Sequence, residues 1–176
     1  MQFPSMDLGQ AYFYTATILN WHHLLKSDRY KDIIMSSLRH LVQRGKIKVY
    51  AFVIMPNHIH LIWELLEMNG KEMPHVSLLK HTAHSFLVDL RQHDPQLLPY
   101  FETKGADRRH HFWQRNSLPI ALYNPAVWRQ KINYVHNNPI QEKWQLAVLP
   151  HEYKYSSAKF YECGIDDFGI LSHWWE

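Results

Sequence analysis

Residues 51–64 have the sequence Ala-Phe-Val-Ile-Met-Pro-Asn-His-Ile-His-Leu-Ile-Trp-Glu. Apolar residues fill both ends of this stretch, and the central Pro56-Asn57 pair is typical of a turn between strands. The pattern predicts one strand over residues 46–55 and a second strand that begins at His58. We expect the two strands to pair antiparallel, because a short turn joins them.

His58 and His60 are two residues apart in the second predicted strand. Alternate side chains of a strand point to the same face, so both imidazoles can bind one metal ion. The opposite face is wholly apolar and is expected to form the core; it carries Ile59, Leu61, Trp63 and Leu65. The pair alone is weak evidence for a metal site, because a chain with 14 histidines contains such a triplet by chance.

A helix is predicted over residues 125–138. Asn124 is a favourable N-cap, Pro125 suits the first helical position, and Pro139 disfavours helical geometry at the residue before it. An apolar stripe for the core is formed by Trp128, Ile132 and Val135. A second, offset stripe contains Val127, Lys131, Tyr134 and Asn138, which places a lysine, a phenol and an amide along one edge.

The two elements together resemble the HUH endonucleases, which combine a His-hydrophobic-His strand with a tyrosine on a later helix. Met-Pro-Asn-His-Ile-His-Leu-Ile and Tyr-Val-His-Asn-Asn-Pro-Ile are similar to the single-tyrosine transposases of bacterial insertion sequences, in particular their REP-associated tyrosine transposase branch. Phe112-Trp113-Gln114-Arg115 and Tyr155-Ser156-Ser157-Ala158 resemble further blocks of that branch. The similarity runs from about residue 10 to the C-terminus.

This resemblance implies a chemistry for the candidate residues. Tyr134 would attack a phosphodiester of single-stranded DNA and form a 5′-phosphotyrosine link, while a 3′ hydroxyl leaves. A divalent cation, Mg²⁺ or Mn²⁺, would be held by His58, His60 and an amide one helical turn after the tyrosine, which is Asn138 here. Asn137 is the alternative third ligand, because Pro139 lies next to Asn138.

The segment from Lys104 to Arg115 is the candidate DNA contact, together with Lys131 on the tyrosine helix. Arginines pair with phosphates and exposed aromatic rings stack on unpaired bases, so the proposed contacts are Arg108, Arg109, Trp113 and Arg115. Trp113 is equally consistent with a core residue, and Lys131 with a solvated helix position.

Composition agrees with a nucleic-acid partner. The net charge is only +3, but residues 100–144 contain seven basic and three acidic side chains. Residues 145–176 have the opposite balance, with two basic and five acidic side chains. Cys163 is the only cysteine, which excludes an intramolecular disulfide. No signal peptide or membrane-span pattern is visible, so we expect a soluble, cytoplasmic bacterial protein that acts at the nucleoid.

The element order predicted from periodicity is strand, helix, strand, strand, helix, strand, helix. The fold class is therefore α+β, and the resemblance implies a ferredoxin-like or RRM-like HUH fold in which helices back one face of an antiparallel sheet of four to five strands. A single domain spans residues 1–176, with a core over about 10–140 and an irregular C-terminal extension over 141–176. The predicted elements are strands at 11–19 and 117–123, helices at 28–44 and about 76–90, and a loop at 93–116.

Two other functions fit parts of the pattern. A rolling-circle-type nickase would use the same chemistry, although such enzymes are often larger than this chain. A binding module with an RRM-like sheet would bind RNA or DNA without catalysis, although the Gly-aromatic motif of that class is absent from the sequence. The oligomeric state is left open between a monomer and a homodimer, and the resemblance suggests DNA with hairpin ends as the partner.

Overall fold

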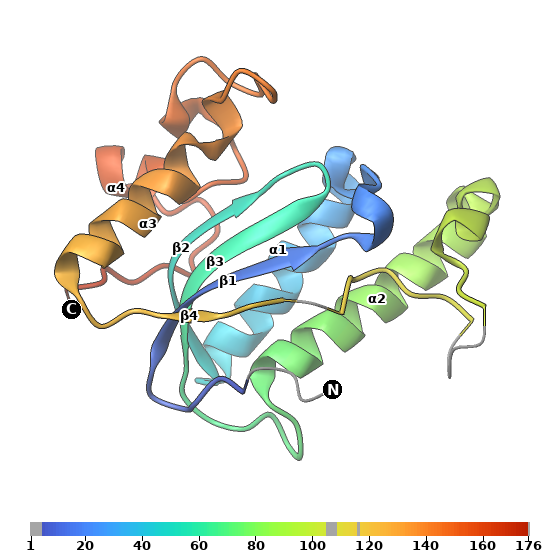
Figure 1. The fold of residues 1–176 in the computed structure, drawn as a ribbon, viewed down its shortest axis with the longest axis horizontal. Coiled ribbons are helices and arrows are strands. Elements are labelled where there is room, and N and C mark those ends of the chain that lie inside the picture. The colour runs from blue at the N-terminus through green and yellow to red at the C-terminus, as the bar shows by residue number, and fades with distance from the viewer. Residues whose placement is uncertain (1–4, 105–108, 116, 176) are drawn as a thin grey trace.

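The Pro-Asn turn joins two antiparallel strands, as predicted. In the computed structural model, which describes residues 5–104, 109–115 and 117–175, β2 (Ile47–Ile54) and β3 (His58–Leu65) pair along their whole length. β1 (Ala11–Thr17) lies on the other side of β3, and β4 (Ile120–Ala121) pairs with the outer side of β1. The sheet therefore has four antiparallel strands in the order β2-β3-β1-β4 (Figure 1).

Two long helices complete a β-α-β-β-α-β order. α1 (Asp28–Gln43) connects β1 to β2, and α2 (Pro74–His93) connects β3 to β4. This element order with this strand order is the ferredoxin-like arrangement that the resemblance implied. Gly45 follows α1 with a positive φ of 66°, a left-handed conformation that glycine adopts without strain and that ends the helix.

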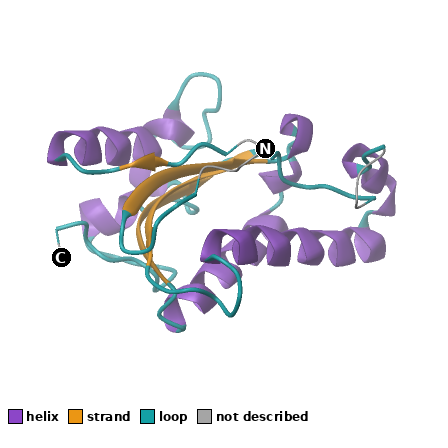
Figure 2. Ribbon diagram, turned by 60° about the horizontal axis from the view of Figure 1, so that its bottom comes forward, coloured by secondary structure: helices purple, strands orange, loops and turns teal. Residues whose placement is uncertain are grey.

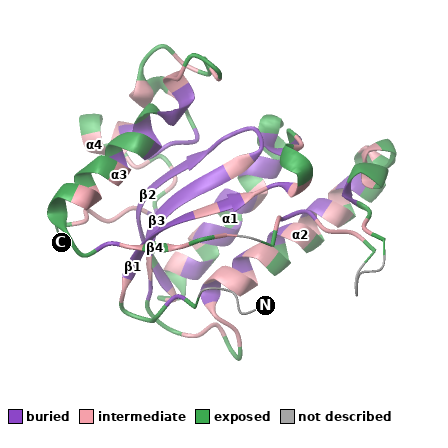
Figure 3. Ribbon diagram, in the orientation of Figure 1, coloured by how far each residue is buried: buried purple, intermediate pink, exposed green. Residues whose placement is uncertain are grey.

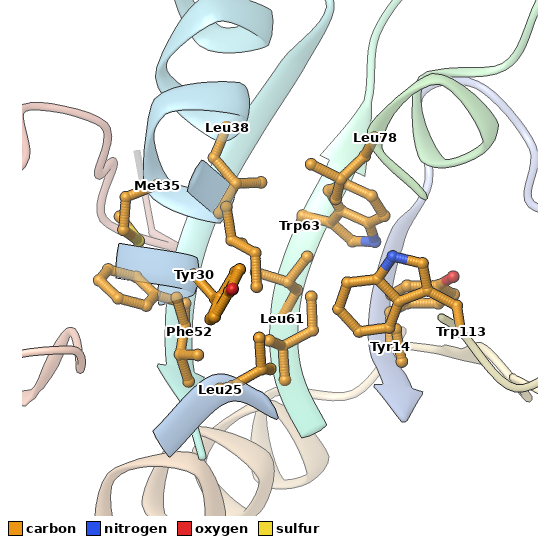
Figure 4. Packing of buried hydrophobic residues seen from close by; sticks show 14 of the residues in the cluster. Tyr14, Leu25, Tyr30, Met35, Leu38, Phe52, Leu61, Trp63, Leu78 and Trp113 are labelled. Carbon is orange, nitrogen blue, oxygen red and sulfur yellow. The ribbon is translucent and has the colours of Figure 1, made fainter. Parts of the chain in front are cut away.

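The larger core lies between the sheet and these two helices. Ile59, Leu61, Trp63 and Leu65 all belong to it, so the apolar face of β3 was assigned correctly. Figure 4 shows Leu38 of α1, Leu78 of α2 and Trp63 of β3 within this layer. Because these side chains are almost fully removed from water, their burial is the main favourable contribution to the fold.

The opposite face of the sheet is covered as well. α3 (Pro125–Asn137) packs Ile132 and Val135 against β2 and β3, in a second core that includes Phe13 and Ile62. Figure 2 shows helices on both sides of the strands, and Figure 3 shows that α3 has an exposed outer surface. The expectation that helices back only one face therefore holds for α1 and α2 but not for α3.

A β-bulge in β2 changes which of its residues face each core. The register of β2 against β3 shifts between Val49 and Ala51, so Tyr50 and Ala51 both belong to the second core. Such a bulge inserts one residue into one strand and changes which face the following side chains point to. After it, Phe52 faces the larger core and Val53 the second one.

The segments outside the sheet are more regular than the sequence indicated. The described residues include five short 3-10 helices, which are η1 (Leu19–Trp21), η2 (Leu24–Lys26), η3 (Pro95–Phe101), η4 (Asn138–Ile140) and η5 (Pro150–Glu152). The longest of them, η3, lies in the segment 93–116 that was expected to be a loop. The C-terminal extension includes α4 (Ala158–Cys163). None of the described helices is both long enough and apolar enough to cross a lipid bilayer.

The C-terminal extension is tied to the edge of β2. The backbone N–H of Ile54 donates to the carbonyl of Tyr155 (2.9 Å), and the N–H of Ser157 donates to the carbonyl of Phe52 (2.9 Å). Tyr155 is 2% exposed and belongs to the larger core. The Tyr-Ser-Ser-Ala block is therefore a structural clamp on the sheet edge.

Candidate active site

His58 and His60 lie side by side on the face of β3 that α3 covers. Their ring centroids are 4.7 Å apart, and the ring planes meet at 71°. His60 also stacks on Phe13 of the neighbouring strand, with ring centroids 5.2 Å apart. The strand alternation thus brings the two imidazoles together, as the sequence predicted.

Each imidazole is held through its Nδ1 atom. Nδ1–H of His58 donates to Oδ1 of Asn57 (2.6 Å), and Nδ1 of His60 shares a hydrogen bond with Oγ1 of Thr15 (2.7 Å). Because a proton on Nδ1 leaves the lone pair on Nε2, this arrangement is the one that histidine ligands of metal ions use. Nε2 of His60 is buried and has no hydrogen-bond partner among the described residues.

Both histidines are neutral at pH 7. Burial lowers the pKa of His58 to about 4, with a further contribution from the positive charge of Lys143. Burial lowers the pKa of His60 to about 3, and electrostatic repulsion from protonated His58, Lys131 and Lys143 acts in the same direction. Two neutral imidazoles, with the Nε2 atom of His60 unpartnered among the described residues, fit a divalent cation, which needs lone pairs from its ligands.

α3 brings Tyr134 to the same place. The helix begins as predicted, because Oδ1 of Asn124 accepts a hydrogen bond from the backbone N–H of Ala126 (2.8 Å). Ile132 and Val135 are buried, which fixes the rotation of the helix and turns Tyr134 toward the histidines. The ring centroid of Tyr134 lies 5.2 Å from that of His60, and the phenol remains 44% exposed.

Lys131 lies one turn before Tyr134 on the same edge. Its Nζ is 4.6 Å from the ring centre of Phe13 and 5.9 Å from that of Tyr134. A cation over these aromatic faces is attracted to their π electrons. The ammonium group is therefore held beside the phenol and the histidine pair.

The two candidate amide ligands have different surroundings. Asn137 is exposed, and its Nδ2 donates to the backbone carbonyl of Asn133 (2.8 Å). Asn138 is 2% exposed and keeps helical geometry in spite of Pro139. No third His, Cys, Asp or Glu joins the pair in the part of the chain that the structure describes, so a third protein ligand would have to be another residue type.

The structure adds residues that the sequence did not indicate. Trp144 lies next to His58, with ring centroids 5.9 Å apart, and Nζ of Lys143 lies 5.7 Å from the ring centre of Trp144. The indole N–H of Trp144 is buried without a hydrogen-bond partner among the described residues. Thr15 and Asn57 are also new to the site. Only the basic-aromatic pair at 143–144 resembles a nucleic-acid contact in the sequence itself.

The segment expected to contact DNA lies elsewhere. Residues 109–115 run beside α2, away from α3 (Figure 1). Arg109 is exposed and pairs with Glu102 (2.9 Å), Arg115 is exposed, and Arg108 lies outside the described residues. Four of the residues predicted to bind DNA are described, namely Arg109, Trp113, Arg115 and Lys131. Of these four, Lys131 is the one that lies beside Tyr134.

The expectation that Trp113 stacks on DNA at the surface needs correction. The side chain is 8% exposed, and its Nε1–H donates to Oγ1 of Thr82 in α2 (3.0 Å). An isolated bridge also joins Trp113 to Ile18. The large ring gains more by joining the core than by facing solvent, which was the alternative left open by the sequence.

His136 points away from the edge of α3 that carries Tyr134. Its Nε2 shares a hydrogen bond with Oγ of Ser157 (2.8 Å), and burial lowers its pKa to about 4. Ser157 in turn accepts a hydrogen bond from the backbone N–H of Phe52 (2.9 Å). His136 thus ties α3 to the clamp on β2 and has a structural role.

Comparisons with other proteins agree with this fold. No family model matches the chain. The REP-associated tyrosine transposase of Escherichia coli strain K12 is 23% identical over 144 residues, which cover 80% of this chain and 72% of that protein. The solved structure of a REP-associated tyrosine transposase bound to a REP hairpin superposes with a TM-score of 0.62 and 18% identity, over 98% of this chain and 90% of that one. The resemblance that the motifs indicated is confirmed.

Proposed function

Because the chain is a relative of the REP-associated tyrosine transposases, we propose that it is a transposase that cleaves and rejoins single-stranded DNA through Tyr134. The observation that carries the proposal is the contact between the half-exposed phenol of Tyr134 and the buried, neutral imidazole of His60, which itself lies against His58. These groups come from α3 and β3, more than 70 positions apart in the chain. No requirement of the fold core explains why a tyrosine should be exposed at that point.

His58 and His60 would hold a divalent cation, Mg²⁺ or Mn²⁺, with Asn138 as the proposed third ligand. The unpartnered Nε2 of His60 and the Nδ1 hydrogen bond of each ring support this assignment. When bound, such an ion withdraws charge from a phosphate and aligns it for in-line displacement. Mixed nitrogen and oxygen ligands without a thiolate favour these ions over a structural zinc.

The proposed reaction conserves the number of phosphodiester-type bonds. Oη of Tyr134 attacks the phosphorus and loses its proton, and a Tyr134–phosphate bond forms at the 5′ side of the break. The bond from phosphorus to the 3′ oxygen breaks, and that oxygen leaves as a hydroxyl with one proton. Attack by another 3′ hydroxyl reverses these steps and joins new ends, so no nucleotide cofactor is consumed. Phenolate is a good leaving group, which makes the link reversible.

Positive charge gathers around this site. The positive charges of Lys131 and Lys143 both lower the pKa of His60. The same two charges would attract a phosphate that binds beside the histidines. The related protein was solved with a REP hairpin, and we propose that this chain also takes DNA with hairpin ends. Lys131 would then contact the backbone close to the cleaved bond.

A binding module without catalysis is less consistent with the structure. RRM-like modules stack bases on an open sheet face. Here α1 and α2 cover one face, and α3 covers the other. Phe13, the aromatic residue of β1 next to His60, is 6% exposed and lies under α3.

Trapping of a covalent adduct tests the proposal. The probe is a labelled library of single-stranded DNA with a randomised segment beside a hairpin stem, incubated with Mn²⁺. We expect an SDS-stable adduct that EDTA prevents and that Tyr134→Phe abolishes. Tyr123→Phe is the matched control, because Tyr123 is 80% exposed just before α3 and should leave the adduct unchanged. An adduct that persists in Tyr134→Phe, or no adduct with the folded wild-type protein, would contradict the proposal.

A further inference from the structure

Two turns of the chain contain residues other than glycine in a left-handed conformation. In the described part of the chain, the non-glycine residues with a positive φ are Asn20 (54°), Trp21 (54°) and Gln145 (46°). This conformation brings Cβ close to a backbone carbonyl oxygen, so it costs free energy at each position. Such strain persists where the surrounding structure holds it in place, and it is concentrated at functional sites.

Hydrogen bonds hold the first turn against the histidine strand. The carbonyl of Trp21 accepts a hydrogen bond from Nδ2 of Asn57 (3.3 Å), and Oδ1 of the same amide accepts one from Nδ1 of His58 (2.6 Å). The backbone N–H of Ile18 also donates to the carbonyl of Asn57 (2.8 Å). Figure 1 shows the segment after β1 next to the turn between β2 and β3. The first turn therefore lies beside the end of the site that His58 occupies.

The second turn reaches the same end of the site from the C-terminus of α3. It is closed by hydrogen bonds from the backbone N–H groups of Trp144 (2.8 Å) and Gln145 (2.9 Å) to the carbonyl of Gln141. The ring centroid of Trp144 lies 5.9 Å from that of His58 and 5.9 Å from that of His23, which follows the first turn. All the left-handed non-glycine residues that the structure describes therefore lie in turns that border His58.

The two turns give the site an aromatic rim, formed by Trp21, His23, Lys143 and Trp144. The indole of Trp21 is 64% exposed, His23 and Lys143 are exposed as well, and Trp144 is half-buried. Nζ of Lys143 lies 5.7 Å from the ring centre of Trp144. Accessible rings beside a cation suit an unpaired nucleotide, because its base stacks on the rings while the cation attracts its phosphate.

The aromatic rim and the nucleophile contact different members of the histidine pair. The ring centroid of Tyr134 lies 5.2 Å from that of His60, whereas the ring of Trp144 lies against His58. In-line displacement at a phosphate places the attacking and leaving oxygens on opposite sides of the phosphorus. An attack from the side of Tyr134 would therefore direct the leaving 3′ oxygen toward the aromatic rim.

We propose that the aromatic rim binds the nucleotide that carries the leaving 3′ hydroxyl. The base of this nucleotide stacks on the indole rings of Trp144 and Trp21, and Lys143 attracts the phosphate on its 5′ side. A nucleotide held in this way stays beside the phosphotyrosine after cleavage and keeps its hydroxyl in place for the reverse attack. The inference rests on the proposed function, because the nucleotide belongs to the DNA that Tyr134 cleaves.

Quenching of a fluorescent base tests the proposal without any cleavage. The probes are two thymidine tetranucleotides that contain one 2-aminopurine, a base whose fluorescence falls when it stacks on an aromatic ring. In the first probe this base belongs to the last nucleotide, which has a free 3′ hydroxyl. In the second probe it belongs to the first nucleotide, which has a 5′ phosphate. In EDTA, we expect the protein to quench the first probe more strongly than the second and to bind it more tightly.

Trp21→Ala is the main variant, because an exposed side chain can be removed without opening the core. It should weaken binding of the first probe at least about 5-fold, as loss of a ring that stacks on a base does. Trp175→Ala is the matched control and should bind the probe as the wild type does. The indole of Trp175 is 63% exposed, against 64% for Trp21, and it stacks on His173 in the C-terminal extension.

Variants of Trp144 extend the test to the ring beside His58. Trp144→Phe keeps an aromatic ring and should retain most of the binding, whereas Trp144→Leu should lose it, with circular dichroism as the check on folding. Equal quenching of the two probes would overturn the proposal, as would equal effects of Trp21→Ala and Trp175→Ala. Tyr134→Phe should quench the first probe as the wild type does, so the aromatic rim and the proposed transposase chemistry succeed or fail separately.

Discussion

The imidazole of His60 meets the phenol of Tyr134 on one side and the hydroxyl of Thr15 on the other. Its ring centroid lies 5.2 Å from that of Tyr134, and its Nδ1 lies 2.7 Å from Oγ1 of Thr15. One strand thus orients a ligand that the neighbouring strand carries, while a helix from later in the chain supplies the nucleophile. The proposed chemistry depends on this three-element junction, and each of its members makes a separate prediction.

Thr15→Val should weaken metal binding. The change keeps the shape of the side chain but removes the hydrogen bond that fixes the ring of His60, and loss of such a partner typically costs about 10- to 100-fold in metal affinity. Calorimetric titration of Mn²⁺ into the protein without DNA measures the effect. Thr17→Val is the matched control, since Thr17 faces His58 on the same strand but makes no hydrogen bond to it. Equal affinities for both variants would show that Thr15 does not position the ligand.

Lys131→Gln should reduce the salt dependence of DNA binding and slow formation of the adduct. The ammonium lies 5.9 Å from the ring centre of Tyr134, where the backbone near the cleaved bond is proposed to pass. Loss of one phosphate contact should lower the slope of log K against log salt by about 1. Arg129→Gln is the comparison on the same helix, because its guanidinium lies over Trp174 and not at the site. A slope that stays at the wild-type value would remove Lys131 from the DNA contact.

Thr82→Val should destabilise the protein without affecting DNA contact directly. The valine has nearly the same shape, but it leaves the buried indole N–H of Trp113 without its acceptor. We expect a loss of about 1–3 kcal/mol in the free energy of unfolding, measured by urea denaturation. In a Trp113→Phe background the same change should cost less, because no N–H then remains to be satisfied. Equal costs in both backgrounds would show that the hydrogen bond contributes little.

The placement of Trp113 illustrates what the sequence could and could not supply. The strand that begins at His58 and the helix after Asn124 have clear periods of 2 and 3.6, and these periods predicted both the shared face of the histidines and the position of Tyr134. Residues 109–115 have no such period. The local sequence therefore does not distinguish a tryptophan that packs in the core from an exposed tryptophan that could stack on a base. The contact that buries Trp113 is with Thr82, which lies 31 residues away in the chain.

The remaining differences arise from tertiary contacts of the same kind. Thr15 is an ordinary strand residue until β1 pairs with β3 in the register that puts it opposite His60. Trp144 belongs to an irregular segment and reaches His58 only after the chain turns back beyond α3. The bulge at Tyr50 also leaves no signal in a strand that is apolar on both faces. Hydrophobic periodicity in the sequence predicts individual strands and helices. The features above depend on tertiary contacts between those strands and helices, which periodicity does not encode.

His136 predicts a specific dependence of stability on pH. Its pKa is lowered from 6.5 to about 4 in the folded protein by burial, so below pH 6.5 the unfolded chain binds the proton more readily. The stabilising contribution of the neutral ring is therefore complete above pH 6.5 and is lost as the pH falls toward 4. The shift corresponds to about 3 kcal/mol at most.

His136→Gln removes this titration. Its effect is measured as the slope of the free energy of unfolding against pH, and not as the stability at a single pH. Urea denaturation between pH 7 and pH 4 should show that the variant loses about 3 kcal/mol less than the wild type over this interval. His58 and His60 remain and keep part of the acid sensitivity, since burial lowers their pKa values as well. His84→Gln, on the exposed side of α2, should retain the full wild-type slope. If His136→Gln and His84→Gln lose stability in parallel with the wild type, the link between α3 and Ser157 does not depend on a neutral imidazole.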